Sequence, residues 1–265
     1  MHERAAAALG LRCHYQLIEV VGATPEELKL LLEGVRRLGF AGINVTFPYK
    51  EAVTGLLDEL SPSARMIGAV NTVVVRNGRL VGYNTDTTGF SRAVGRLIAA
   101  SAHGAVTVIG AGGVGKAIAF ALASLGVSEL RIFDRELAKA THLATQLQGQ
   151  TSTSVPENIE DAVQGVAGIV NGSPVGMLPD CHTPVPEGCL HAGMWVADAV
   201  YFPLWTPLLL AAKASGASIM TGRELAIYQA ADAFELFTGL RPSSIEMATA
   251  FDDVIARRCS PSHPL

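Results

Sequence analysis

The chain has 265 residues, of which 49% are apolar and 17% charged, and its formal net charge is −4. This length suffices for one large domain or for two modest ones, each with a core of its own. A weakly acidic chain gives no reason to expect nucleic acid as a partner. Since no stretch approaches the roughly 18 uninterrupted apolar residues of a membrane span, we expect a soluble protein without a membrane partner.

The cysteines predict neither disulfides nor a metal site. They stand at positions 13, 181, 189 and 259, with no paired spacing, so we expect free thiols in a reducing, cytoplasmic compartment. Cys181 with His182, and Cys189 with His191, are the nearest approach to a ligand set. Prolines intervene and no pair has two-residue or helical spacing, so we expect no metal.

The first third of the chain predicts a mixed sheet with helices. Residues 1–10 are typical of a helix rather than a secretory signal, because Glu3 lies in the charged part and the apolar run is short. His14–Val20 and Phe40–Thr46 are predicted strands. Between them, Thr24-Pro-Glu-Glu27 is a capping box that opens a helix to about Leu38.

A hairpin follows, because Val70–Arg76 and Leu80–Tyr83 flank the turn dipeptide Asn77-Gly78. This hairpin places an antiparallel pair in the first sheet. From Val106 the pattern alternates strand and helix, which predicts a parallel, nucleotide-binding sheet. The predicted segments there are strands at 106–109, 129–133, 168–171 and 195–198, helices at 116–125 and 136–147, and a variable polar stretch at 148–158.

The expected fold class is α/β with two domains and a cleft between them. The first is a mixed-sheet α/β domain over residues 1–88, completed by C-terminal helices within 240–265, and the second is a Rossmann-type doubly wound domain over residues 89–239. Helices at 86–102 and 223–239 are predicted to bridge the two, and a last helix is predicted over 243–258.

The run from Val106 to Gly115 predicts a dinucleotide site, because a β-branched strand leads into a glycine turn and then a helix. Gly110 permits the tight turn, Gly112 lets the backbone approach a pyrophosphate, and Gly115 lets the helix pack on the strand. Asp134 ends the next strand at the distance expected for an acceptor of ribose hydroxyls. The alternative is a glycine-rich loop in an ordinary α/β domain.

Three polar clusters follow strands in the first half: Asn44–Lys50, Gly68–Thr72 and Gly82–Gly89. A lysine in a partly desolvated cleft can exchange a proton with a substrate hydroxyl, and a nearby carboxylate can orient that hydroxyl. Lys50 and Asp86 suit these roles. For either residue alone, the plainer interpretation is preferred: a surface lysine and a helix N-cap aspartate.

Together, these clusters closely resemble the shikimate dehydrogenase family, over nearly the whole chain. Its substrate motifs N-[VI]-T-x-P-x-K, G-A-x-N-T and G-x-N-T-D-x-x-G are similar to residues 44–50, 68–72 and 82–89. Its nicotinamide loop N-x-[ST]-P-x-G-M resembles residues 171–177, and its D-x-x-Y-x-P-x-x-T motif resembles residues 198–206. Residues 222–230 are similar to its G-x-x-M-x-x-x-Q-A helix.

The resemblance implies reversible hydride transfer between C4 of a nicotinamide and the C3 carbinol of a ring carboxylate such as quinate or shikimate. It implies that Lys50 exchanges the proton of the C3 hydroxyl and that Asp86 holds the same hydroxyl. Substrate binding is implied for Thr46, Asn71, Tyr201 and Gln229. The cofactor-binding residues that we expect are Gly110, Ala111, Gly112, Gly113, Val114, Gly115, Asp134, Arg135, Ser173, Val175, Met177, Val200, Gly222 and Ala226.

The expected cofactor is NAD, with NADP possible. At the position of Asp134-Arg135-Glu136, NADP-using members of the family carry a motif that looks like N-R-T. The carboxylates of Asp134 and Glu136 would repel a 2′-phosphate. Arg135 leaves the alternative open, since it could stack on adenine or grip a phosphate. With residues 226–229 and 236–239, this signature is similar to the NAD-dependent quinate/shikimate branch, which serves quinate catabolism.

One family pattern is interrupted. Members of the family carry a motif that looks like S-x-[ST]-P-x-M-H near their start. This chain begins at Met1-His2, which resembles the Met-His of that motif. We expect a missing segment that would supply a strand and two hydrogen bonds to the substrate carboxylate.

The leading hypothesis is thus an NAD-dependent quinate/shikimate dehydrogenase, monomeric or homodimeric. The alternatives are an NADP-dependent biosynthetic shikimate dehydrogenase and a noncatalytic nucleotide or ligand sensor.

Overall fold

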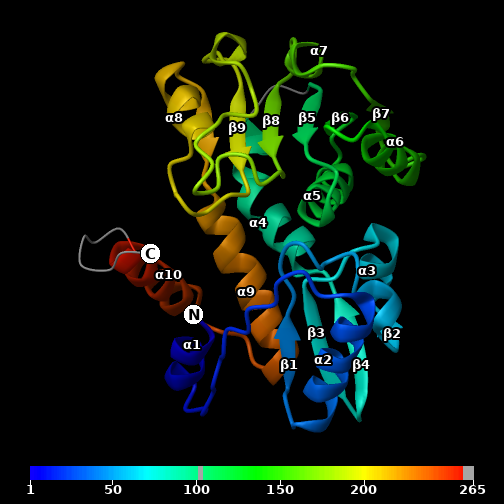
Figure 1. The fold of residues 1–265 in the computed structure, drawn as a ribbon. Coiled ribbons are helices and arrows are strands. Elements are labelled where there is room, and N and C mark those ends of the chain that lie inside the picture. The colour runs from blue at the N-terminus through cyan, green and yellow to red at the C-terminus, as the bar shows by residue number, and fades with distance from the viewer. Residues whose placement is uncertain (101–103, 259–265) are drawn as a thin grey trace. The chain divides into compact units, whose positions relative to one another are not determined.

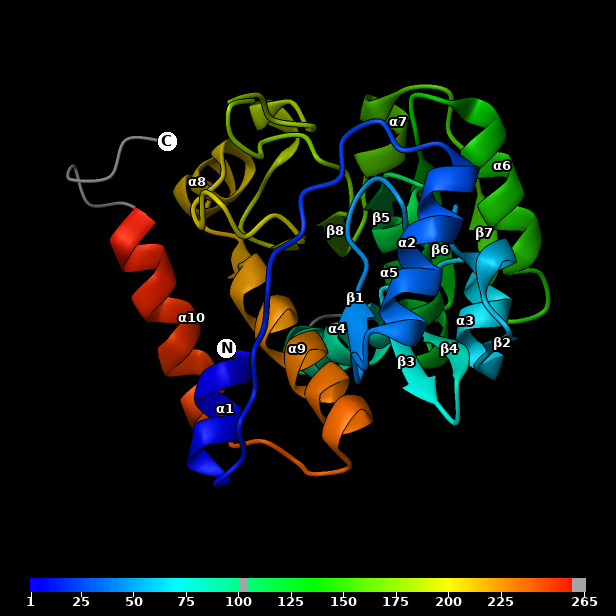
Figure 2. The ribbon, with the colours of Figure 1, turned by 60° about the horizontal axis from the view of Figure 1, so that its bottom comes forward.

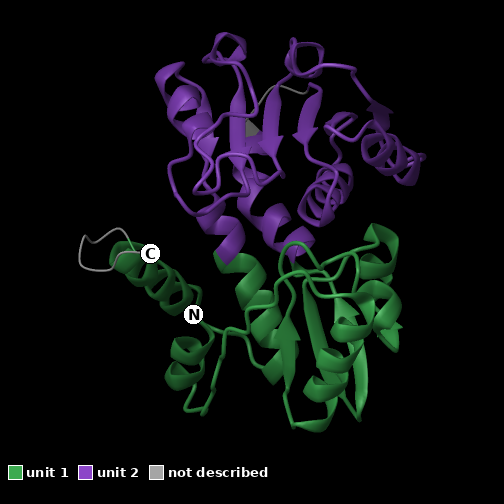
Figure 3. Cartoon of the chain, in the orientation of Figure 1, with its two compact units in different colours: residues 1–85, 227–265 green, residues 86–226 purple. Residues whose placement is uncertain are grey.

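The computed structural model describes residues 1–100 and 104–258, and the chain forms two compact units (Figure 3). Unit 1 comprises Met1–Thr85 with Ile227–Leu265, and unit 2 comprises Asp86–Ala226. The second division lies inside helix α9 (Gly222–Thr238). This helix continues across the division because it contains neither a proline nor an internal glycine that would interrupt it.

The two-domain α/β fold is confirmed, and unit 1 contains the expected mixed sheet (Figure 1). Its strand order is β1-β3-β4-β2, in which β3 is antiparallel to β1 and β4, while β2 is parallel to β4. The predicted hairpin is confirmed at Asn77 and Gly78, whose φ angles of 50° and 74° suit a two-residue hairpin turn. The strands are β1 (Gly42–Asn44), β2 (Glu59–Leu60), β3 (Thr72–Arg76) and β4 (Arg79–Tyr83).

Helices cover this sheet with apolar side chains at helical spacing. Helix α2 buries Leu28, Leu32 and Val35, and Leu32 joins the core that lies between this helix and the sheet. Helix α1 lies beside α10, where Arg4 bonds to Glu246 at 3.0 Å (Figure 2). The helices of unit 1 are α1 (His2–Ala8), α2 (Pro25–Arg37), α3 (Pro62–Ile67), α10 (Ser244–Arg258) and the later part of α9, with a 3₁₀ turn at Thr54–Leu56.

The predicted strand at His14–Val20 is wrong. The segment is irregular, and β1, the strand at that edge, pairs among the described residues with β3 alone. Side-chain contacts hold the segment at Tyr15, whose hydroxyl donates to Asn44 at 2.9 Å and whose ring stacks on His2. Leu17 is 72% exposed, so the apolar residues of this segment do not form a buried face. Alternating apolar residues form a strand only where a neighbouring strand pairs with their backbone groups.

Unit 2 is built on a six-stranded sheet of order β10-β9-β8-β5-β6-β7, in which all pairs are parallel. The chain runs outward from β5 to β7 and then returns to β8 on the other side of β5. In open α/β sheets, such a reversal marks the place, at the carboxyl ends of the two strands, where ligands usually bind. The strands are β5 (Val106–Ile109), β6 (Glu129–Phe133), β7 (Ser152–Ser154), β8 (Gly168–Asn171), β9 (Trp195–Asp198) and β10 (Ser218–Met220).

The helices of this unit follow the strands, as a doubly wound fold requires. The sequence did not predict β7, a short polar edge strand in the stretch expected to be variable, nor the short elements α7, α8 and β10. The helices are α4 (Thr85–Ala100), α5 (Gly113–Ser124), α6 (Leu137–Gln146), α7 (Ile159–Val163), α8 (Pro207–Ala214) and the start of α9, with a 3₁₀ turn at Glu187–Cys189. Among the described residues, no helix combines the length and the apolar character that a membrane crossing requires.

The capping box of α2 gives a test of local stability. The Thr24 side chain accepts from the Glu27 amide at 3.2 Å, and the Glu27 carboxylate accepts from the Thr24 amide at 2.8 Å. Thr24→Ala should lower the free energy of unfolding by about 1 kcal/mol, because one amide loses its partner. Thr24→Ser keeps the acceptor and serves as the control. Equal urea midpoints for Thr24→Ala and the parent chain would contradict this role.

Candidate functional site

At the end of β5, three backbone segments lie too close together for side chains. A Cβ atom on Gly115 would lie 1.8 Å from the Gly110 carbonyl oxygen, and one on Gly172 would lie 2.8 Å from the Gly115 Cα. Gly110 has a φ of 94°, which disfavours any other residue, and a Cβ there would meet the Ser173 amide at 2.9 Å. The glycine turn, helix α5 and the loop after β8 are therefore packed backbone against backbone.

Gly112 differs from these glycines, because a Cβ there would meet no atom of the described residues within 4 Å. Its φ of −77° and ψ of −174° are accessible to any residue. Neither packing nor conformation explains a glycine at this position, so it fits a site where a ligand approaches the backbone. No side chain caps α5, whose first turn, with Gly113 and Val114, offers backbone N–H groups and the positive end of the helix dipole.

Asp134 joins this turn to the next strand. Its carboxylate accepts from the Ala111 amide at 2.7 Å and from the Glu136 amide at 2.8 Å. A carboxylate offers about four acceptor positions, so two bonds leave capacity for further hydroxyl donors. Arg135 is exposed beside it, and the Glu136 carboxylate pairs with Lys139 at 2.6 Å. The negative charge facing this edge therefore comes mainly from Asp134.

The loop after β8 folds around Asn171. The Asn171 side chain donates to the Val175 carbonyl at 3.0 Å and accepts from the Ser173 hydroxyl at 2.6 Å and amide at 3.1 Å. These bonds turn the chain back on itself directly after the strand. Three expected cofactor residues, Ser173, Val175 and Met177, lie in this loop, and the Met177 side chain is 42% exposed.

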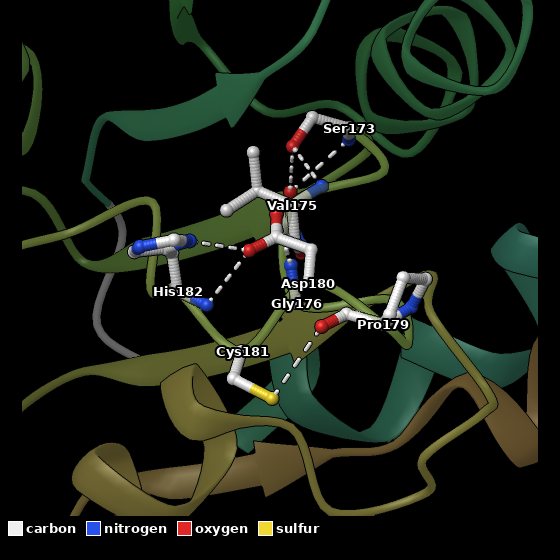
Figure 4. A network of polar contacts seen from close by, with 8 residues as sticks. Ser173, Val175, Gly176, Pro179, Asp180, Cys181 and His182 are labelled. Atoms are coloured by element: carbon white, nitrogen blue, oxygen red, sulfur yellow. Dashed lines mark hydrogen bonds and ion pairs between the residues drawn. The ribbon is translucent and has the colours of Figure 1, made fainter.

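A second anchor holds the far end of the same loop (Figure 4). The Asp180 carboxylate accepts from the Gly176 amide at 3.3 Å and from the His182 amide at 2.9 Å, and it contacts His182 Nδ1 at 2.5 Å. The hydrogen bonds from the backbone and side chain of His182 lower the pKa of Asp180. The free thiol of Cys181 contacts the Pro179 carbonyl, 3.7 Å from Sγ.

The loop after β9 lies against the start of α9. A Cβ on Gly222 would lie 2.4 Å from the Val200 carbonyl oxygen, so the helix approaches this loop only because residue 222 lacks a side chain. Val200 and Gly222, both expected at the cofactor, are thus brought together, with Ala226 one helical turn further on. Tyr201, expected at the substrate, follows Val200 and is 48% exposed.

In unit 1, Asn71 is the centre of a buried polar network. Its Nδ2 donates to the Thr85 hydroxyl at 2.9 Å and to Gln229 Oε1 at 3.5 Å, and its Oδ1 accepts from the Thr85 amide at 2.8 Å. The Thr72 hydroxyl also donates to Asn71 Oδ1, at 3.0 Å. Two expected substrate residues, Asn71 and Gln229, therefore meet although they are distant in sequence.

Backbone bonds hold the Thr46–Lys50 segment close to Asn71. The Val45 amide donates to the Asn71 carbonyl at 2.8 Å, and the Val70 amide donates to the Lys50 carbonyl at 2.8 Å. Thr46 is exposed and Lys50 is half-buried. Asp86 lies in the first turn of α4 and is only 5% exposed. A carboxylate there benefits from the positive end of the helix dipole.

Sequence reasoning assigned no role to Asn44 and Thr85, although both lie in the quoted motifs. Asn44 donates to the Thr72 hydroxyl at 3.0 Å and accepts from Tyr15, and Thr85 is 4% exposed beside Asn71. It also assigned none to Asp198, the fully buried last residue of β9. For Asp198, the available signal was a polar residue that ends an otherwise apolar strand.

The burial of Asp198 makes the stability of the chain depend on pH. Burial raises its pKa from 3.8 to about 7, against the opposing hydrogen bonds from Thr206, Val200 and Asn171. The folded chain therefore binds more protons than the unfolded chain between those values, so stability is lost as the pH rises through them. Relative to Asp198→Asn, the unfolding free energy should fall between about pH 4 and pH 7, by no more than about 4 kcal/mol at 1.36 kcal/mol per pKa unit. A pH-independent difference between the two urea curves would contradict the shift.

Comparison with known proteins agrees with these features. Residues 1–73 match the shikimate dehydrogenase substrate binding domain, and residues 94–166 match the shikimate / quinate 5-dehydrogenase domain. A shikimate dehydrogenase (NADP(+)) of Streptomyces avermitilis is 41% identical over 93% of this chain and 87% of its own length. A quinate/shikimate dehydrogenase (NAD(+)) of Corynebacterium glutamicum strain R is 40% identical over 95% and 92%.

A solved structure of a related dehydrogenase has the same fold as this chain. The quinate dehydrogenase from Corynebacterium glutamicum in complex with NAD superposes with a TM-score of 0.86, at 39% identity over 95% of this chain and 92% of that one. The motifs, the doubly wound sheet and these relatives agree over nearly the full length. The chain belongs to the shikimate/quinate dehydrogenase family.

Proposed function

We propose that this protein is an NAD-dependent dehydrogenase that oxidises the C3 hydroxyl of quinate or shikimate, and reduces the corresponding ketone, in the cytoplasm as a monomer or homodimer. The observation that carries the proposal is the glycine turn of unit 2, where the open position at Gly112 and an uncapped helix N-terminus lie next to Asp134. Unit 2 would hold the cofactor and unit 1 the ring.

The chemistry of the donor groups fits NAD. Pyrophosphate oxygens would accept from the amides of residues 112–115, and ribose hydroxyls would donate to the remaining acceptor positions of Asp134. The loop residues Ser173, Val175 and Met177, with Val200, Gly222 and Ala226, would contact the nicotinamide end. When bound, NAD supplies the hydride acceptor at C4 of its nicotinamide ring.

Asp134 supports NAD over NADP, because its charge would repel a 2′-phosphate. Its two backbone bonds fix the carboxylate at the end of β6, so it has little freedom to turn away. The relatives include proteins named for either cofactor. NADP-dependent shikimate dehydrogenase is therefore the second candidate, supported by the exposed guanidinium of Arg135.

Neutral hydrogen-bonding groups in unit 1 suit a polyhydroxylated ring. Asn71, Gln229 and Thr46 would bind the ring hydroxyls, and Tyr201 would border the substrate. Asn71 already uses both amide hydrogens and both acceptor positions of its oxygen, so a ring hydroxyl would bind it by replacing a weak partner, such as Gln229 at 3.5 Å. An analogue that lacks a hydroxyl would leave a buried polar group unpaired, which disfavours its binding.

Proton transfer is assigned to Lys50. In oxidation, the C3 hydroxyl would release its proton to the Lys50 amine as the hydride leaves C3, and the reverse reaction would return that proton. Asp86 would hold the same hydroxyl in place, and Lys50 would then pass the proton to water, which restores its amine. Each reaction then releases or consumes one proton, and the chain itself is unchanged at the end.

The first test follows nicotinamide absorbance with NAD or NADP and with quinate or shikimate in turn. Turnover is expected with NAD, with kcat/KM at least about tenfold above that with NADP. Lys50→Ala should lower kcat by about 100-fold or more, because proton transfer loses its partner. Lys29→Ala, which removes an exposed lysine of α2 in the same unit, is the matched control.

Equal loss in both lysine variants would show that charge rather than proton transfer matters. Higher kcat/KM with NADP would favour the second candidate. No turnover with any combination, from a chain that nevertheless binds NAD, would favour a noncatalytic sensor.

Gly112 gives a test of binding alone. Gly112→Val should weaken NAD binding by at least about tenfold, because the side chain fills the space left for the ligand. The unfolding midpoint should change little, since a Cβ there meets no protein atom within 4 Å. Gly188→Val places the same side chain at another open, exposed position and should leave the dissociation constant unchanged. Undiminished NAD affinity in Gly112→Val would place the pyrophosphate elsewhere.

A further inference from the structure

Asp198 occupies a central position at the carboxyl edge of the parallel sheet. It is the last residue of β9, it is 0% exposed, and its register partner is Asn171, the last residue of β8. The two side chains therefore leave neighbouring strands at the same level. From this level the loops over residues 172–178 and 199–206 begin.

All three donors to the Asp198 carboxylate are neutral and come from different segments. Oδ1 accepts from Asn171 Nδ2 at 3.0 Å and from the Val200 amide at 2.9 Å, and Oδ2 accepts from the Thr206 hydroxyl at 2.7 Å. Thr206 is itself fully buried and caps α8 by accepting from the Leu209 amide at 3.3 Å. One carboxylate thus joins β8, the loop after β9 and the start of α8.

These bonds continue into the loop after β8. The Asn171 amide nitrogen that donates to Asp198 also donates to the Val175 carbonyl, and Asn171 Oδ1 accepts from Ser173. The orientation of the Asn171 amide is fixed by this pattern, because only its nitrogen can serve a carboxylate and a carbonyl together. Asp198 therefore sets which way the Asn171 side chain turns, and with it the path of residues 173–175.

We propose that Asp198 is a positioning residue for hydride transfer, which fixes the two loops that carry Ser173, Val175 and Val200 against the nicotinamide end of the cofactor. This inference rests on the proposed function for the identity of the ligand. Asp198 acts through Asn171, Val200 and Thr206, and it does not touch the reacting atoms. The adenosine end, held by the glycine turn and Asp134, does not depend on it.

Loss of the Asp198 carboxylate should lower the rate of hydride transfer more than it weakens binding of the adenosine half of the cofactor. Without it, buried donors on three segments lose their acceptor, and the loops must shift or admit water to satisfy them. Displacement of a positioning loop by a fraction of an ångström to an ångström is enough to lower a rate substantially. The adenosine half should keep its geometry, because Gly172, where the loop packs on the glycine turn, is held by its amide bond to the Ile109 carbonyl at 2.8 Å and not by Asp198.

The experiment compares Asp198→Ala with Thr107→Val in the full chain. Thr107 is a matched control, since it is fully buried in unit 2 and donates to the Ala162 carbonyl at 2.5 Å, away from both loops. Amide hydrogen exchange is measured over residues 172–178 and 199–206. Dissociation constants are measured for NAD and for ADP-ribose, which lacks the nicotinamide, and kcat is measured with NAD and quinate or shikimate.

For Asp198→Ala we expect faster exchange in both loops, a kcat lowered by about 10- to 100-fold, and an ADP-ribose dissociation constant within about twofold of the parent value. Thr107→Val should show none of the loop changes and no comparable loss of kcat. Asp198→Asn keeps an acceptor for the two N–H donors, so it should recover part of the loss. If Asp198→Ala does not fold, Thr206→Val, which removes one donor, should show a smaller change of the same kind.

Unchanged exchange in both loops, or equal weakening of NAD and ADP-ribose binding, would overturn the positioning role. Failure of the proposed function gives a different result. In that case the parent chain shows no turnover with any cofactor and ring, while faster exchange in the two loops of Asp198→Ala still supports the inference that Asp198 holds them.

Discussion

The close contact of backbone with backbone at the carboxyl edge of the six-stranded sheet is the constraint on which the site depends. Gly110, Gly115 and Gly172 meet at distances that no Cβ would tolerate, so the glycine turn, helix α5 and the loop after β8 have essentially one arrangement. That arrangement directs the uncapped start of α5 toward the open space at Gly112 and brings Ser173 next to Gly110. A binding site for phosphate groups and a loop for the nicotinamide follow from the same contact.

Hydrogen bonds between buried polar groups complete what the glycines begin. In unit 2, the hydrogen bonds of Asn171 and Asp198 fix the conformation of the loops that follow β8 and β9. In unit 1, Asn71 performs a similar task for the hairpin, Thr85 and Gln229. Both networks are made from groups whose donors and acceptors are matched, and such networks hold a side chain in one orientation at little cost.

Much of the fold was predictable because its signals are local. The buried strands β5, β8 and β9 are short apolar runs, the hairpin is marked by Asn77-Gly78, and the capping box marks the start of α2. Residues 14–20 failed because alternation describes an extended chain but not its pairing partner, which is a non-local property. The same reason explains why Asp198 was missed, since its contacts join residues such as Asn171, 27 positions away. The glycine motif and Asp134 were found because their spacing follows from one strand–helix–strand unit.

The most direct test of the account is the fate of the hydrogen on C3. Quinate and shikimate that carry deuterium at C3 are incubated with the full chain and NAD, and the reduced cofactor is isolated and its mass measured. The account predicts that the deuterium appears in the nicotinamide ring of the reduced cofactor, because the hydride moves directly from carbon to carbon. Reduced cofactor that lacks the deuterium, or deuterium that remains on the ring while NAD stays oxidised, would contradict it.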